Sequence, residues 1–314
     1  MKRQILIFYI ITLASLNLTA TKIYTSDLTN FWTAYDSVIS TSNNNLKIKF
    51  ITDLYINKAS KGLNEFINAR NLTAEDWVNS INKYPKFWVS IRPKTLSVLK
   101  HQNEIERALN EFKKQYPNFK QPDIYFTIGC LKTGGTTSKE QILIGTEIAT
   151  GDSTVDSSEL IPFFQKYFKH NNNIIQLVTH EMNHTQQQLE LPQNPTLLAK
   201  CIMEGSCDFI AEIILNNPYN AVYIEYGEKN KLELLKKVTV DADKLEYSDW
   251  MYNYNTTTNI PADLGYFIGY TIAKEYYNNS KNKKKAIKDI IELNWLDNNK
   301  MSELLSLAKK KNGL

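Results

Sequence analysis

Cysteine and long apolar segments are both scarce in this chain. Its 314 residues include only 3 Cys, none in a CxxC pair, so a thiolate zinc site is not indicated and at most one disulfide can form. Glycine and proline, with 11 and 9 residues, are too few for collagen-like or low-complexity structure. Beyond the N-terminal region, no apolar run reaches the roughly 20 residues that a transmembrane helix needs.

The charge is low and evenly spread. Lys and Arg number 37 and Asp and Glu 33, for a formal net charge of +4, and no basic stripe marks a nucleic-acid surface. We therefore expect no nucleic-acid partner. Hydrophobic residues make up 42% of the chain, which is enough for an extensive core in one large domain or two closely packed ones.

The first twenty residues have the pattern of a secretory signal peptide. Lys2 and Arg3 precede an apolar run from Ile5 to Leu16, and polar residues then lead to Ala20. We expect residues 1–20 to be a signal peptide and the protein to be exported, periplasmic or secreted, with no stable membrane span after cleavage. Leu18 is a poor residue at the minus-three cleavage position, so an uncleaved N-terminal anchor is the alternative.

Hydrophobic periodicity divides the rest of the chain into helical and strand-like parts. Apolar positions recur every three or four residues from Leu28 to Leu109, with a capping box at Thr73–Asp76. β-branched and aromatic residues then predict two strands, 124–128 and 142–148, which we expect to be antiparallel. Further helices are predicted over 158–168, 174–189, 197–215, 264–277 and 283–293.

These patterns predict an α+β fold that is mainly helical, with a small antiparallel sheet packed on the helix of residues 174–189. No repeat, linker or composition shift divides the chain. We therefore expect one unit with two lobes, residues 21–170 and 171–314, and a cleft between the lobes. The second lobe would be almost entirely helical.

One pentapeptide carries the strongest chemical signal. His180-Glu-Met-Asn-His184 matches HExxH inside an apolar helical pattern, so both imidazoles lie on one helical face and can reach a single zinc ion. Glu181 stands beside them as a candidate general base. A pair of surface histidines is the alternative explanation, but a chance match is rare in a chain with only 4 His. His101 and His170 lie far from the motif and are expected to be ordinary polar residues.

A catalytic zinc usually has three protein ligands and one open position, so a third ligand is expected. Glu190 lies at the spacing of metzincins, but Gln187 occupies the position of their turn glycine. Glu204 lies on the next predicted helix, nineteen residues (185–203) after His184. A short loop would bring that helix back antiparallel beside the first.

The second helix carries an acidic stripe in an otherwise apolar sequence. Glu204, Asp208 and Glu212 recur at four-residue spacing, which places them on one face. Asp208 is a candidate outer-sphere acceptor for a histidine N–H, because carboxylates commonly orient metal-bound imidazoles. A solvated helix face would explain the same stripe, most simply at Glu212.

This combination of motifs resembles the gluzincin metallopeptidases, the thermolysin-like superfamily. The sequence around the two motifs, Leu177–Gln187 and Ile202–Glu212, is similar to that of predicted exported Zn-dependent proteases related to gliding-motility-B-like proteins of Bacteroidetes. The match covers about residues 174–215. The resemblance implies a zincin-like fold and one Zn²⁺, with His180, His184 and Glu204 as ligands, Glu181 as base and Asp208 in the outer shell.

These residues permit hydrolysis of a peptide bond. Zinc lowers the pKa of its bound water to about 7, and Glu181 takes the proton as the water attacks a carbonyl and then gives it to the leaving amine. Gluzincins commonly add a Tyr or His donor for the oxyanion. Tyr266 and Tyr270, in a stretch that also resembles the family, are the candidates, with Tyr270 preferred. In a chain with 18 Tyr, an ordinary core or surface role is the more common explanation of either residue.

The expected partner is a peptide or protein substrate, bound as an added strand along a sheet edge. We expect the strand from Gln141 to Ile148 to be that edge. Gly134 and Gly135 would let a backbone approach closely, although a hairpin turn explains them equally well. Arg92 is a candidate for holding a substrate carboxylate, but a structural salt bridge is the simpler expectation.

Two other functions stay open. The first is a non-catalytic zinc-containing protein with a peptidase-like fold, such as an envelope or motility accessory or binding protein. A structural zinc is closed by a fourth protein ligand and has no use for Glu181, so the intact motif favours catalysis. The second is hydrolysis of a non-peptide amide or ester. Two imidazoles and one carboxylate suit zinc better than cobalt or manganese.

Overall fold

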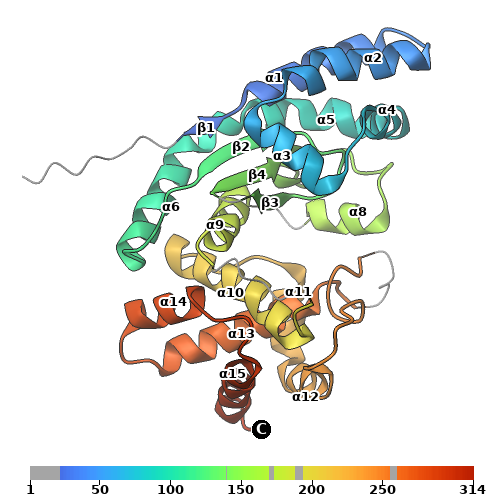
Figure 1. Ribbon diagram of the computed structural model, residues 1–314. Helices are drawn as coiled ribbons and strands as arrows, with labels where there is room; N and C mark the ends of the chain where they lie inside the picture. The colour runs from blue at the N-terminus through green and yellow to red at the C-terminus, as the bar shows by residue number, and fades with distance from the viewer. Residues whose placement is uncertain (1–21, 139, 170–172, 188–193, 255–259) are drawn as a thin grey trace, which may run out of the picture.

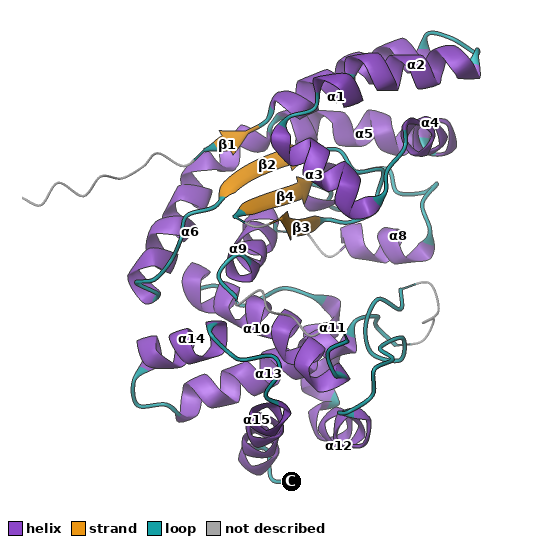
Figure 2. Ribbon diagram, in the orientation of Figure 1, coloured by secondary structure: helices purple, strands orange, loops and turns teal. Residues whose placement is uncertain are grey.

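Most of the chain forms helices around one small sheet (Figures 1 and 2). The computed structural model describes residues 22–138, 140–169, 173–187, 194–254 and 260–314. The predicted signal peptide lies outside these ranges, as do His170 and Glu190. Within the described ranges, no helix is both long and apolar enough to cross a membrane.

The N-terminal part is helical, as its periodicity predicts. Its elements are α1 (Ser26–Ile39), α2 (Asn44–Leu54), the 3₁₀ helix η1 (Ile56–Lys58), α3 (Lys61–Arg70), α4 (Ala74–Lys83), α5 (Pro85–Leu96), the 3₁₀ helix η2 (Val98–His101) and α6 (Gln102–Gln115). Capping side chains fix where several of these helices begin. Asn43 and Ser60 cap α2 and α3, and Thr73 and Asp76 form the predicted capping box of α4.

The sheet has the strand order β1-β2-β4-β3. Its strands are β1 (Ile23–Tyr24), β2 (Asp123–Thr127), β3 (Gly135–Ser138) and β4 (Gln141–Gly145). β1 and β4 flank β2 and run parallel to it, whereas β3 pairs antiparallel with β4. The sheet is therefore mixed, and the expected antiparallel pairing of the two predicted strands is wrong.

Strand β3 accounts for this difference. Its segment looks like a turn because of Gly134 and Gly135, yet the β-branched Thr136 and Thr137 suit a strand. Because β3 forms a hairpin with β4, the chain reverses twice between β2 and β4, which leaves those two strands parallel. Among the described strands β3 is thus an edge and β4 an inner strand. The expected edge at Gln141–Ile148 is wrong, and Ile148 belongs to the short helix α7 (Thr146–Ala149).

The C-terminal part is helical. Its elements are α8 (Pro162–Lys169), α9 (Ile174–His184), α10 (Leu197–Leu215), α11 (Val222–Lys229), α12 (Lys231–Asp241), α13 (Leu264–Asn279), α14 (Lys283–Ile291) and α15 (Asn298–Lys311). The HExxH helix α9 lies between the sheet and α10 (Figure 1) and contacts β3 and β4. This is the predicted packing of a sheet on the motif helix.

Two hydrophobic clusters meet along α10 and α13. Phe209 and Tyr270 belong to the cluster that surrounds the sheet, whereas Ile202 and Ile268 belong to the cluster that includes α12 and α15. The two helices cross closely because Gly205 and Gly269 carry no side chain, and a Cβ on Gly269 would collide with the backbone of α10. The crossing places the start of α13 near the motif helix, where the rings of Tyr266 and His180 have centroids 6.3 Å apart. All three cysteines are buried and free.

Candidate metal centre

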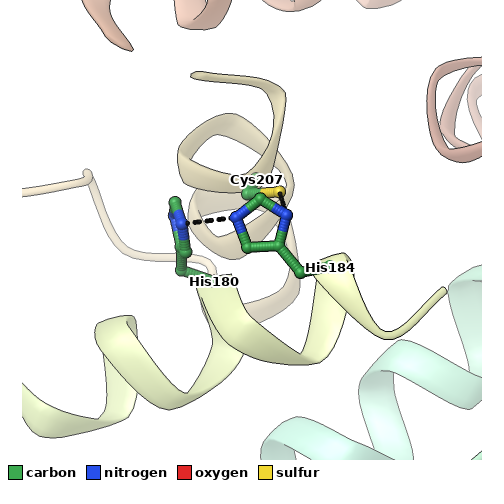
Figure 3. Close-up of side chains that lie close together, drawn as sticks. All are labelled: His180, His184 and Cys207. Carbon is green, nitrogen blue, oxygen red and sulfur yellow. Dashed lines mark hydrogen bonds between the residues drawn. The ribbon is translucent and has the colours of Figure 1, made fainter. Parts of the chain in front are cut away.

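Helix α9 places the two histidines of the motif one turn apart. The side chain of Asn173 caps the helix by accepting hydrogen bonds from two backbone N–H groups. His180 and His184 then share one face, and their Nε2 atoms lie 3.0 Å apart (Figure 3). His180 is only 6% exposed, so the pair is not the surface pair of the alternative explanation.

Glu204 reaches the same point from α10. Its Oε2 atom lies 3.2 Å from Nε2 of His184 and 3.7 Å from Nε2 of His180. Ligand atoms around a tetrahedral zinc, each with a bond of about 2.0–2.1 Å, are about 3.3 Å apart. The three observed distances between the Nε2 atoms and Oε2 of Glu204, 3.0, 3.2 and 3.7 Å, lie on both sides of that value. These residues therefore fit a zinc ion.

Asp208 orients the first histidine. Its Oδ1 lies 2.7 Å from Nδ1 of His180, and since a carboxylate only accepts, Nδ1 carries the proton. The hydroxyl of Tyr223 donates to the other oxygen of this fully buried aspartate at 2.8 Å. This is the contact expected of an outer-sphere carboxylate.

The second oxygen of Glu204 is also occupied. Lys200 donates to Oε1 at 2.9 Å and the hydroxyl of Tyr252 donates at 3.1 Å, so Oε2 alone faces the histidines. Sequence reasoning missed these partners. The four-residue spacing of Lys200 and Glu204 on one helix is a signal that could have revealed the first, whereas Tyr223 and Tyr252 have no local signal.

The electrostatics of this cluster favour positive charge. Although burial lowers it, the Asp208 carboxylate raises the pKa of His180 well above its usual value. Burial also lowers the pKa of His184, but Cys207 and Glu204 raise it well above its usual value. Burial raises the pKa of Glu204, yet His184 and the other nearby cations hold it well below the usual range. A cation is therefore stabilised where the three side chains meet.

Glu181 lies near the two histidines on α9, with its carboxyl group against the edge strand β3. Its carboxyl group packs against Gly135, where an added Cβ would lie 2.5 Å from Oε1. Only 6% of the residue is exposed, and burial raises the pKa of its carboxyl group. A raised pKa suits a general base that must also release its proton.

The structure brings one of the two predicted tyrosines to the histidines. The ring of Tyr266 stacks beside that of His180, with centroids 6.3 Å apart, and its hydroxyl makes no hydrogen bond to another described residue. Tyr270 instead donates to Glu212 at 2.8 Å and accepts from Lys274 at 3.1 Å. The geometry thus favours Tyr266 over the preferred candidate.

Cys207 lies behind His184. Together with the two histidines it forms a second possible ligand group. Its Sγ atom, however, lies 3.4 Å from Nδ1 of His184, the ring nitrogen that points away from His180 (Figure 3). The thiol therefore does not face the point shared by the two Nε2 atoms and Glu204.

The remaining candidates lie elsewhere. Arg92 forms a two-pronged salt bridge with Asp36, with distances of 2.6 and 2.8 Å, so the structural role expected for it is confirmed. His101 lies 3.7 Å from Glu104 at the start of α6, apart from the histidine pair.

A groove lined mainly by polar residues includes the turn that follows α9. It has a volume of about 920 Å³, and Thr185 and Gln187 from the turn after α9 form part of its wall. Ser138 of β3 and Gln141 of β4 line it as well. The groove therefore joins the end of the edge strand to the surroundings of His184.

Comparison with known proteins agrees with a zinc-dependent site. The model of a family described as predicted Zn-dependent protease (DUF2268) matches residues 109–294, more than half of the chain, and the chain belongs to this family. The matched region contains β2 to β4 and all residues of the cluster. No curated protein and no solved structure gave a match.

Proposed function

We propose that this protein is an exported zinc metallopeptidase of the gluzincin type. The observation that carries the proposal is the triangle formed by Nε2 of His180, Nε2 of His184 and Oε2 of Glu204. Its sides suit a single Zn²⁺, and the family description independently indicates a zinc-dependent protease. The signal-peptide pattern of residues 1–20 supports export. The sequences around both motifs support a relationship to the predicted exported proteases of Bacteroidetes.

In this proposal His180, His184 and Glu204 hold the metal, and Asp208 holds His180. Zinc, when bound, supplies a Lewis acid that polarises a carbonyl and lowers the pKa of water to about 7. Glu181 accepts the proton of the attacking water and passes it to the leaving amine, a transfer that its buried carboxyl group favours.

Tyr266 is proposed as the donor to the oxyanion. Its hydroxyl has no partner among the described residues, so it is free to donate to the carbonyl oxygen of the substrate. Its ring stands beside His180 and is held there by the crossing of α13 and α10.

The substrate is proposed to be a polypeptide that adds a strand to the edge of β3. This strand carries Gly135 against Glu181, so a peptide paired with it would pass the general base. The groove beside Ser138 and Gln187 would take the polar side chains of the same peptide.

Metal removal tests the proposal. We expect the purified protein to hold one zinc ion per chain and to cleave peptides, to lose both properties on chelation, and to regain them with zinc. His184→Ala should bind no zinc, because two remaining ligands rarely suffice. Peptide cleavage that persists in a zinc-free sample would contradict the proposal.

A further inference from the structure

Gln187 is a buried amide behind the second histidine. It stands three residues after His184, in the turn that follows α9, and only 6% of it is exposed. Its Oε1 lies 2.8 Å from Nδ1 of His184. It therefore touches the ring nitrogen opposite to the one that faces His180 and Glu204.

A second contact fixes which end of this amide faces the histidine. The Nε2 group of Gln187 donates to the backbone carbonyl of Met203 at 2.9 Å, and Ser206 Oγ lies 3.4 Å away. A backbone carbonyl only accepts, so the amide nitrogen must point to Met203 and the amide oxygen to His184. Since the oxygen only accepts, Nδ1 of His184 is the donor and carries the proton.

The protonation of both rings then follows. Asp208 places the proton of His180 on Nδ1 in the same way. When the rings are neutral, as zinc binding requires, these tautomers leave a lone pair on each Nε2 atom, 3.0 Å apart, and Oε2 of Glu204 adds a third acceptor. Three lone pairs then point to one place, as the ligands of a metal ion must.

We propose that Gln187 is a positioning residue of the metal centre: it fixes the tautomer and ring orientation of His184, and through them the affinity for zinc. The inference rests on the proposed zinc site. Cys207 is a poor substitute, because its Sγ lies 3.4 Å from the same Nδ1 and thiols are weak partners. A histidine ligand without its outer partner typically loses about 10- to 100-fold in metal affinity.

The chain offers a matched control in the adjacent glutamine. Gln186 bonds the backbone of Lys120 at 2.8 and 2.9 Å and touches neither histidine. We would measure zinc dissociation constants by chelator competition, at one fixed pH, for the wild type, Gln187→Met, Gln187→Glu and Gln186→Met. Methionine keeps the size of the side chain without the acceptor, whereas glutamate keeps the acceptor.

We expect Gln187→Met to bind zinc about 10- to 100-fold more weakly. Gln186→Met should stay near the wild type, and Gln187→Glu should lose less affinity than Gln187→Met, because it keeps the acceptor for Nδ1 although it loses the donor to the Met203 carbonyl. If the wild type binds zinc and Gln187→Met binds it as tightly as Gln186→Met does, the proposed role of Gln187 is wrong while the zinc site stands. A wild type that binds no zinc would instead overturn the metal site of the proposed function.

A second measurement covers the case in which Gln187→Met does not fold. The ¹⁵N spectrum of the imidazoles in the zinc-loaded wild type reports which nitrogen of each ring binds the metal, and the chain has only 4 His to assign. We expect His184 to bind zinc through Nε2 and to keep a proton on Nδ1. Binding through Nδ1, the nitrogen beside Cys207, would overturn the proposal.

Discussion

The carboxyl group of Glu181 rests directly on the backbone of Gly135, the first residue of the edge strand β3. An added Cβ at residue 135 would lie 2.5 Å from Oε1 and 2.9 Å from Cγ of Glu181. The glycine is thus needed for a close approach between α9 and the sheet. The proposed general base and the proposed substrate edge are held together at this contact.

A methyl group at residue 135 should therefore displace the base. We expect Gly135→Ala to lower peptide cleavage at least about tenfold, because general bases contribute 10²–10⁴-fold, while zinc content stays normal. Gly134→Ala is the control, since the atoms nearest its Cβ are side-chain atoms of Ile148 and Leu177 at 3.2 Å or more. Cleavage rates and zinc content of both variants check this, and equal rates would contradict the placement of Glu181.

The two predicted tyrosines should differ sharply. Removing an oxyanion donor typically costs about 10²–10³-fold in kcat. We expect Tyr266→Phe to lose on that order, because its hydroxyl is free beside His180. Tyr270→Phe should retain most of kcat, because its hydroxyl is bound to Glu212. The reverse order of the two variants would restore Tyr270 as the donor.

A buried acid outside the metal centre should make stability depend on pH. Glu147 is fully buried in α7 and accepts the backbone N–H groups of Gly129 and Leu131 at 3.0 and 2.8 Å. Cys130 and Leu131 of this loop have positive φ angles of 56° and 60°, which strain side-chain-bearing residues. Burial raises the pKa of Glu147 from 4.5 to about 7.

The sign of the effect follows from proton linkage. Between pH 4.5 and 7 the folded chain keeps a proton on Glu147 that the unfolded chain has released. This contribution to stability is complete below pH 4.5 and is lost as the pH rises through about 7, by at most about 3 kcal/mol. Urea unfolding of zinc-free wild type and Glu147→Gln at pH 5 and 8 checks this. The free energy of unfolding of the variant relative to the wild type should increase with pH, and a constant difference would contradict the shift.

Long segments with a hydrophobic period were predictable from the sequence. The short strand β3 and the relative orientation of the strands were not. The bounds of α10 match the prediction, because Thr196 caps a continuous apolar pattern. The four-residue strand β3 is too short to show a period. The orientation of β2 relative to β4 depends on that strand, so the mixed sheet could not be inferred from periodicity alone.

The residues of the candidate metal centre likewise fall into those that the sequence predicts and those that it does not. HExxH and the later Glu204 and Asp208 follow from helical spacing, and the structure brings both histidines and Glu204 together, with Asp208 bonded to the far nitrogen of His180. Gln187 also has a local signal, three residues after His184. Tyr252 reaches Glu204 from a loop 48 residues away in sequence, and only tertiary packing determines that contact.

The most direct test of the central claim is the cleavage of a mixed peptide library by the wild type and by Glu181→Gln, with zinc content measured in both. We predict that both bind one zinc ion and that only the wild type cleaves, with a loss of about 10²–10⁴-fold in the variant. Zinc binding without cleavage by the wild type would contradict peptidase activity on these substrates and favour a non-catalytic zinc protein. Cleavage by both proteins at equal rates would contradict Glu181 as the base.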